Sequence, residues 1–178
     1  MALLALGLTL VALIQVLCLF ALVDQYKSLL QIREALRLVD TPNEIPLFDL
    51  QGTLPSSAGL PATIDSEPFA VILLLSTKCT TCKAVARGMG GQVPVHSWAL
   101  VEGGSERECL EFKEEVGLPD KQVLIDVGGR IAQKLGTRIF PSAIVFSNGV
   151  ARSARTVPSY RQFRQLLDKR EESYSEAS

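Results

Sequence analysis

Hydrophobic residues are concentrated in two continuous runs, one at the N-terminus and one near the middle of the chain. From Ala2 to Val23 the only polar side chains are Thr9 and Gln15. A helix of this length, rising about 1.5 Å per residue, spans the roughly 30 Å hydrocarbon core of a bilayer. The run exceeds the apolar core of a cleaved signal peptide, about 7–15 residues, and no Lys or Arg precedes it. The pattern predicts an uncleaved membrane anchor over residues 2–23 of an N-terminal segment 1–23.

Polar residues return at Asp24, and residues 24–44 are predicted to form a helical stalk or linker that ends before Pro42. Hydrophobic residues there fall on the a and d positions of a heptad repeat. The repeat leaves two interpretations open: a short coiled coil that forms a homodimer through residues 22–39, or an amphipathic helix on the membrane or on its own domain. The heptad residues are Leu22, Leu29, Ile32, Leu36 and Val39.

Residues 45–170 alternate short apolar runs with amphipathic segments, which is typical of an α/β domain. The run from Phe69 to Ser76 is apolar almost throughout, as in a strand buried on both faces. The tail 171–178 is acidic and rich in small residues, and we expect it to be disordered. The predicted strands are 69–76, 93–101, 122–125, 143–146 and 150–156, with a short strand pair near 47–50. The predicted helices are 80–89, 105–116, 129–135 and a last one that opens at Pro158.

Short signals mark where several of these elements begin and end. Ser105 with Glu108 forms a capping box for a helix that stops at Gly117. Asn148-Gly149 is a strong signal for a two-residue β-hairpin. A parallel βαβα half followed by a hairpin and a helix predicts a central mixed sheet with helices on both faces.

Composition limits the function classes. The chain has 178 residues and a formal net charge of −1 with interspersed charges, so no basic patch indicates nucleic-acid binding. Four cysteines in a chain of this length do not make a disulfide framework, and only one pair is closely spaced.

That pair, Cys79-Thr-Thr-Cys82, follows the buried strand and opens the first helix of the domain. A helix N-terminus favours a thiolate, so we expect Cys79 to be the nucleophile, assisted by Lys78 and Lys83, and Cys82 to be the resolving thiol. A zinc site would need a second Cys or His pair at suitable spacing, which is missing. We therefore expect no metal and no cofactor, with His96 packed or on the surface and Cys109 in the core.

The order of elements and the placement of the CxxC pair resemble the thioredoxin fold. Within that superfamily the chain resembles membrane-anchored proteins of the TlpA/MauD type, the second being accessory proteins of methylamine utilisation. The resemblance rests on the anchor, on the lead-in 46–52, on Cys79–Lys83 and on the run 136–146. It implies that Pro141 is a cis-proline facing the CxxC pair, and that Phe140 and Pro141 bind an extended peptide substrate.

Three residues depart from the patterns of the related proteins. Thr80 stands where MauD-like proteins usually have proline, and Lys78 replaces a common tryptophan. Leu73 occupies the place of a buried aspartate that handles protons in thioredoxin. The expected function is a membrane-tethered thiol–disulfide oxidoreductase that acts on cysteines of a partner protein during maturation or assembly of a specific target. The alternative is a non-catalytic thioredoxin-like scaffold or assembly subunit of a membrane complex.

The expected partners are a cysteine-containing protein substrate, a redox partner and the lipid bilayer, the last through residues 2–23. Lys27, Arg33 and Arg37 follow the anchor and favour a cytoplasmic domain by the positive-inside rule. The resemblance implies the opposite, extracytoplasmic side. Because a bias of three residues is a weak topological signal, we expect a single-pass protein of the cell membrane with its domain on the periplasmic side.

Overall fold

The computed structural model describes residues 15, 18, 19, 22, 25–27, 42–46 and 54–175, and side chains as far as residue 168. The chain divides into two compact units, residues 1–41 and 42–178. The described positions of the first unit are helical. Among all described residues, no helix combines the length and the apolar character that crossing a membrane requires. The predicted anchor (2–23), stalk (24–44), dimer segment (22–39) and strand pair (47–50) lie wholly or largely outside the described residues.

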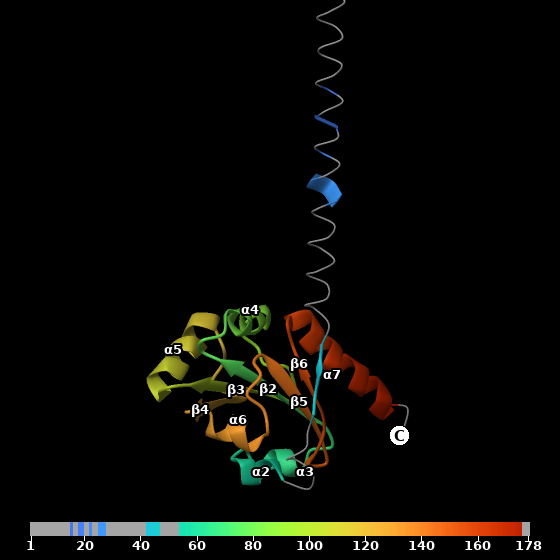
Figure 1. Cartoon of the computed structure of the whole chain (residues 1–178). Helices are drawn as coiled ribbons and strands as arrows, with labels where there is room; N and C mark the ends of the chain where they lie inside the picture. Colours follow the sequence, from blue (N-terminus) through green and yellow to red (C-terminus); the bar gives the residue numbers. More distant parts are fainter. Residues whose placement is uncertain are drawn as a thin grey trace, which may run out of the picture. The chain divides into compact units, whose positions relative to one another are not determined.

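The second unit is built on one six-stranded mixed sheet, in the order β1-β6-β5-β2-β3-β4 (Figure 1). β2 pairs in parallel with β3, and β3 in parallel with β4. β5 pairs antiparallel with both β2 and β6, and β1 antiparallel with β6. This is the mixed sheet that the sequence predicts. The strands are β1 (Glu44–Ile45), β2 (Ala70–Ser76), β3 (Ser97–Gly103), β4 (Val123–Val127), β5 (Ser142–Ser147) and β6 (Val150–Thr156).

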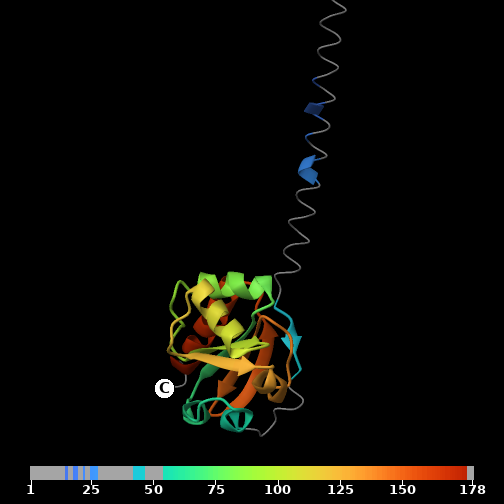
Figure 2. The ribbon, with the colours of Figure 1, turned by 90° about the vertical axis from the view of Figure 1, so that its left-hand side faces the viewer.

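Helices cover both faces of this sheet, as Figure 1 and the turned view in Figure 2 show. One hydrophobic cluster lies under α4, α5 and α7, and a second lies under α2, α3 and α6. β2 supplies both clusters, because successive side chains of a strand point to opposite faces. All seven of its residues are buried, which confirms the interpretation of the apolar run. The helices are α2 (Pro55–Ala58), α3 (Thr63–Ser66), α4 (Thr80–Gly88), α5 (Glu106–Val116), α6 (Arg130–Lys134) and α7 (Tyr160–Ser175).

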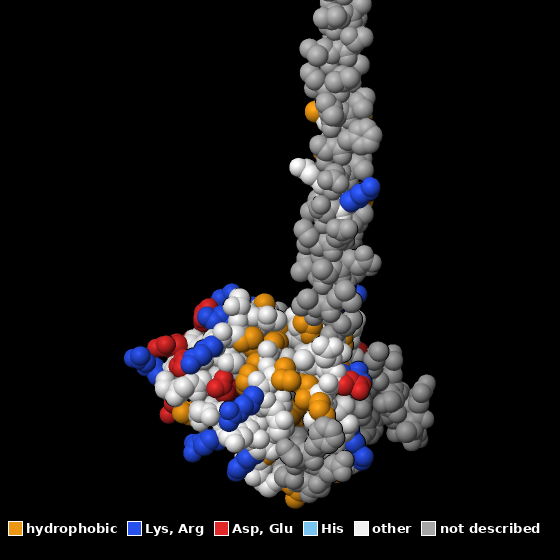
Figure 3. Space-filling model, in the orientation of Figure 1, with side chains coloured by type: hydrophobic (Ala, Val, Ile, Leu, Met, Phe, Trp, Pro, Cys, Tyr) orange, Lys and Arg blue, Asp and Glu red, His pale blue; other side chains and the backbone are white. Residues whose placement is uncertain are grey.

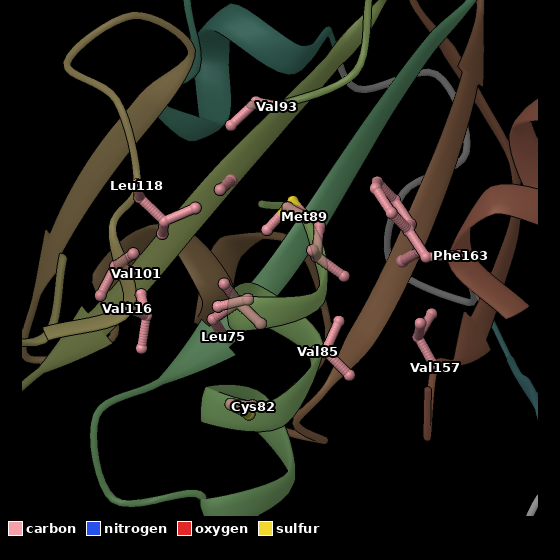
Figure 4. Packing of buried hydrophobic residues seen from close by; sticks show 14 of the residues in the cluster. Leu75, Cys82, Val85, Met89, Val93, Val101, Val116, Leu118, Val157 and Phe163 are labelled. Carbon is pink, nitrogen blue, oxygen red and sulfur yellow. The ribbon is translucent and has the colours of Figure 1, made fainter. Parts of the chain in front are cut away.

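The first cluster supports α4, the helix that begins at the cysteine pair. Figure 4 shows Cys82 and Val85 of α4 and its C-cap residue Met89 within it, with Val116 and Leu118 to one side and Val157 and Phe163 to the other. Cys82, Val85 and Phe163 are each at most 1% exposed. Burial of these side chains fixes α4 on the sheet and therefore fixes where its first turn begins.

Short sequence signals correctly predicted where several helices and strands begin or end. Ser105 caps α5 by accepting a hydrogen bond from the Glu108 N–H, and the helix stops at the left-handed Gly117. Asn148 and Gly149 both have positive φ, as a tight β5–β6 hairpin requires. Cys109 is fully buried in the first cluster, as predicted.

Two boundaries were wrong. The strand predicted from residue 93 begins only at Ser97, because Pro94 accepts turn hydrogen bonds and His96 has a positive φ of 58°. His96 therefore lies in an exposed turn and not in a strand. The last helix continues to Ser175, so residues 171–175 are helical where disorder was expected. Glu171 and Glu172 have high helix propensity and extend a helix that is already anchored by packing.

Candidate functional site

Cys79 is presented at the first turn of α4 by a two-residue connection from β2. It is the N-cap residue, with extended backbone angles, and its Sγ accepts a hydrogen bond of 3.1 Å from the Cys82 N–H. The Cys79 N–H in turn donates to the Ser76 carbonyl at 3.1 Å. The N-terminal dipole of a helix and an N–H directed at the sulfur both stabilise a thiolate there. Cys79 is half-buried, so the sulfur remains within reach of a reactant.

Cys82 lies one turn further along α4 and differs from Cys79 in its surroundings. It is fully buried, and neither cysteine is in a disulfide. Burial raises the pKa of the Cys82 thiol far above its usual value, and its hydrogen bond with Cys79 raises that pKa further. Cys82 therefore holds its proton more tightly than an ordinary cysteine, and its burial contrasts with the half-buried Cys79 sulfur, so the two sulfurs have different roles in the reduced pair.

The loop before β5 reaches the same point from far away in the sequence. Cys79 Sγ lies 3.8 Å from the Phe140 carbonyl oxygen, to which its S–H donates. The Phe140–Pro141 peptide bond is cis, as the resemblance implied. The Phe140 side chain packs against both hydrophobic clusters, and Ile139 beside it is 49% exposed. The structure thus brings together all four residues that the sequence singled out.

Hydrophobic side chains gather across the middle of the face shown in Figure 3, with charged side chains around its rim. The motif itself contributes small polar residues, since Thr80 and Thr81 are both exposed. A cysteine with an apolar residue beside it can therefore approach Cys79 without having to desolvate a charge of the motif.

Lys83, which the sequence suggested as an aid to the Cys79 thiolate, forms an ion pair with a carboxylate of α5. Its Nζ is 2.7 Å from Glu115 Oε2, and Arg87 bonds the other oxygen of the same carboxylate at 2.8 Å. These bonds, first of all that from Lys83, hold the pKa of Glu115 below its usual range. The Lys83–Glu115 ion pair links α4 to α5. Exposed Lys78 directly precedes Cys79, and its charge adds to the hydrogen bonds from Thr77 and Gly104 in lowering the pKa of Glu108.

Position 73, in the cluster beneath the cysteine pair, is occupied by leucine and not by an acid. Leu73 is 1% exposed and shares the first cluster with Cys82. The buried carboxylate of the described part is Asp126, whose two oxygens accept the Ile131 and Ala132 N–H groups at 2.9 and 2.8 Å. It caps the start of α6, so its hydrogen-bonding capacity is used in holding the fold.

Sequence reasoning missed one pair of residues, Thr77 and Glu108. The Thr77 hydroxyl donates to Glu108 Oε1 at 2.5 Å. The capping-box pattern found Glu108 but predicted that its carboxylate would return to its own helix end at Ser105. Its other oxygen accepts instead from the Gly104 N–H at 2.9 Å. A contact over 31 positions leaves no spacing signal in the sequence.

Within the described residues, no group of three or more His, Cys, Asp or Glu side chains is placed to hold a metal ion. What the site does hold is a strand–loop–helix CxxC unit facing a cis-proline loop, on a mixed sheet covered on both faces. This is a thioredoxin-like fold. Its two thiols, one accessible and one buried, can interconvert with a disulfide.

Comparisons with known proteins found similar solved structures, all at low sequence identity. No protein-family model matches the sequence, and no curated protein matches it. A secreted Mycobacterium tuberculosis disulfide oxidoreductase homologous to Escherichia coli DsbE is 17% identical, covering 59% of this chain and 83% of its own, with a TM-score of 0.42. The thioredoxin domain of a thiol-disulfide oxidoreductase from Bacteroides vulgatus is 12% identical, covering 60% and 84%, at 0.44. StoA from Bacillus subtilis is 9% identical, covering 56% and 81%, at 0.43.

Since all three TM-scores are below 0.5, the fold assignment rests on the topology and the site geometry of this chain.

Proposed function

We propose that this protein is a thiol–disulfide oxidoreductase that exchanges disulfides with a partner protein through Cys79 and Cys82. One observation carries the proposal: Cys79 Sγ sits at the N-cap of α4, accepts the Cys82 N–H and lies 3.8 Å from the Phe140 carbonyl beside Pro141. This geometry supplies an accessible sulfur at a helix N-terminus, a protected second thiol and a backbone carbonyl beside the reactive sulfur.

The exchange proceeds in two displacements. The Cys79 thiolate attacks one sulfur of a substrate disulfide, an S–S bond forms between them, and the other substrate sulfur leaves and takes a proton. Cys82 then loses its proton and attacks Cys79, which breaks the mixed disulfide and releases the second substrate thiol. The CxxC dithiol is oxidised to a disulfide as the substrate disulfide is reduced by two electrons. The reverse sequence oxidises a substrate dithiol, and relative reduction potentials set the direction.

The expected substrate is an extended cysteine-containing segment with an apolar residue near the cysteine. Half-exposed Ile139 and partly buried Phe140 flank Pro141 and offer apolar surface beside the Cys79 sulfur. A substrate segment in an extended conformation suits such a site because the segment's own backbone groups are not already paired within it.

We further propose that the domain is tethered to the cell membrane through residues 2–23 and acts on the extracytoplasmic side. The apolar run from Ala2 to Val23 supports the tether. The proposed substrate chemistry supports the side, because protein disulfides form and persist outside the reducing cytoplasm. A tethered site would meet partners that are themselves confined to the membrane surface.

Substrate capture tests the exchange reaction. With Cys82→Ala, the resolving thiol is missing, so the full chain is expected to accumulate a mixed disulfide between Cys79 and a partner cysteine. Non-reducing gels and mass spectrometry of the linked peptides detect it, and Cys18→Ala provides a matched control that should accumulate none. A stoichiometric partner that stays bound regardless of changes at both CxxC cysteines would favour a scaffold instead.

Labelling of intact cells tests the side of the membrane. A membrane-impermeant maleimide is expected to modify Cys79 in intact cells after mild reduction, because its sulfur is half-exposed. Cys109 is fully buried and its pKa is raised to about 11, first by burial and then by Glu108, so it serves as an internal unlabelled control. Labelling of Cys79 only after lysis would contradict an extracytoplasmic domain.

A further inference from the structure

Thr77 is held by three separate contacts, although it belongs to the short connection between β2 and α4. Its N–H donates to the Glu102 carbonyl at 2.9 Å, and its hydroxyl donates to Glu108 Oε1 at 2.5 Å. Its methyl group lies above Gly103, where an added Cβ would come within 3.0 Å of Thr77 Cγ2. Two residues later the chain reaches Cys79, so the position of Thr77 determines where the sulfur is presented.

The two carboxylate oxygens of Glu108 accept hydrogen bonds from two different parts of the chain. Oε2 accepts a hydrogen bond from the Gly104 N–H, just before the start of α5. Oε1 accepts a hydrogen bond from the Thr77 hydroxyl in the β2–α4 connection. These bonds, first that of Thr77 and then that of Gly104, hold the pKa of Glu108 below its usual range, with the charge of Lys78 acting in the same direction. The carboxylate is therefore ionised at neutral pH and makes charge-assisted hydrogen bonds, which are stronger than neutral ones.

Gly103 of β3 packs close beneath this bond. A Cβ on Gly103 would lie 2.7 Å from Cys109 Sγ as well as 3.0 Å from the Thr77 methyl group. The absence of a side chain at Gly103 therefore lets Thr77 and the buried Cys109 thiol both lie close to the β3 backbone. A simple capping role does not account for the Thr77 bond, because Ser105 and Oε2 already satisfy the start of α5.

We propose that the Thr77–Glu108 hydrogen bond is a positioning contact of the dithiol site: it clamps the β2–α4 connection to α5, so that Cys79 is presented in register with the N-terminus of α4. The inference rests on the proposed function of the CxxC pair. Glu108 touches neither cysteine in this role and acts through Thr77.

The bond can be removed without changing charge or volume by Thr77→Val in the full chain. The loosened connection lets Cys79 leave the N-cap geometry, in which the helix N-terminus and the Cys82 N–H stabilise its thiolate. We expect alkylation of Cys79 by iodoacetamide at pH 7 to slow about threefold to tenfold, where tenfold corresponds to one pKa unit. Peptide mass spectrometry follows Cys79 separately from the other cysteines. The reduction potential, measured in glutathione buffers, should become more negative, because the reduced form loses stabilisation.

Three further variants make the test specific. Thr77→Ser keeps the hydroxyl and should restore the wild-type rate and potential, which a loss of stability alone would not explain. Thr63→Val, the same change at an exposed position of α3, is the matched control and should alter neither the alkylation rate nor the reduction potential. In a Glu108→Ala background, Thr77→Val should have no further effect, since the bond is already absent.

Wild-type alkylation rate and potential in folded Thr77→Val would overturn the positioning role, as would a further effect of that change in the Glu108→Ala background. Failure of the proposed function is distinguishable, because it would appear in the wild-type chain as an inability of Cys79 to form a disulfide with Cys82. The alkylation rate needs only the free thiol and reports on positioning in either case.

Discussion

Cys79→Ser is expected to abolish disulfide exchange while the fold is retained. A serine hydroxyl is not ionised at neutral pH and cannot form the mixed disulfide, so the loss should be at least about 1,000-fold, as for removal of a catalytic nucleophile. Serine is also a good N-cap residue, and its Oγ can accept the Cys82 N–H in place of Sγ. Reduction of a disulfide-linked model substrate, together with thermal unfolding, measures both effects.

The control for this variant is Cys18→Ser, the same chemical change at a cysteine in the first unit. It should leave exchange unchanged. Retention of exchange in Cys79→Ser, with an unfolding transition like that of the wild type, would show that the reactive sulfur is elsewhere in the chain.

Leu73→Asp is expected to be among the most destabilising single changes in the domain, and its cost should depend on pH. Leu73 is 1% exposed and contacts the cluster that supports Cys82 and α4. Loss of the leucine contacts costs about 2–5 kcal/mol. Burial would raise the pKa of the new carboxyl above its unfolded value of about 3.9, and each unit of that rise adds about 1.4 kcal/mol once the group must ionise.

The sign of the pH dependence follows from that raised pKa. The added cost is absent below about pH 4, grows as the unfolded chain releases the proton, and levels off above the pKa of the folded state. The native acids Glu108, Glu115 and Asp120 have lowered pKa values and act in the opposite sense, so that their stabilisation is lost as the pH falls. They are common to all variants and cancel in a comparison.

Leu73→Asn provides that comparison, because it removes the same contacts without a titrating group. Urea unfolding of both variants in the full chain at pH 4.5 and pH 7.5 should show the Asp variant falling further below the Asn variant at the higher pH. An unchanged difference would mean that water reaches position 73, contrary to the packing of Leu73 in the first cluster.

The amino-acid pattern alone was sufficient to predict the features that neighbouring residues determine. A seven-residue apolar strand has to be buried on both faces, Asn148-Gly149 adopts the positive φ values of a tight hairpin, and Ser105 and Gly117 end α5 by satisfying its own backbone groups. The alternation of these elements also predicted the mixed sheet and the helix that opens with Cys79. The hairpin, the ends of α5 and the burial of the strand each depend on residues within a few positions of one another.

The pattern misplaced the start of β3 because it did not show the turn at Pro94 and His96. The Gln122 side chain, 28 positions away, donates to the Pro94 carbonyl and so supports that turn. The ion pair of Lys83 with Glu115, 32 positions away, likewise leaves no mark in a local pattern.

The sequence by itself determined which sulfur pair this protein presents and which strand and helix carry it, because strand, loop and helix N-terminus are contiguous. Only the tertiary structure decided what surrounds the pair: the Phe140 carbonyl 61 positions from Cys79, and Glu108 31 positions from Thr77. Those contacts form when burial of both faces of β2 brings α4, α5 and the loop before β5 to one end of the sheet. The approach of distant groups follows from packing of the whole domain, and no local pattern encodes it.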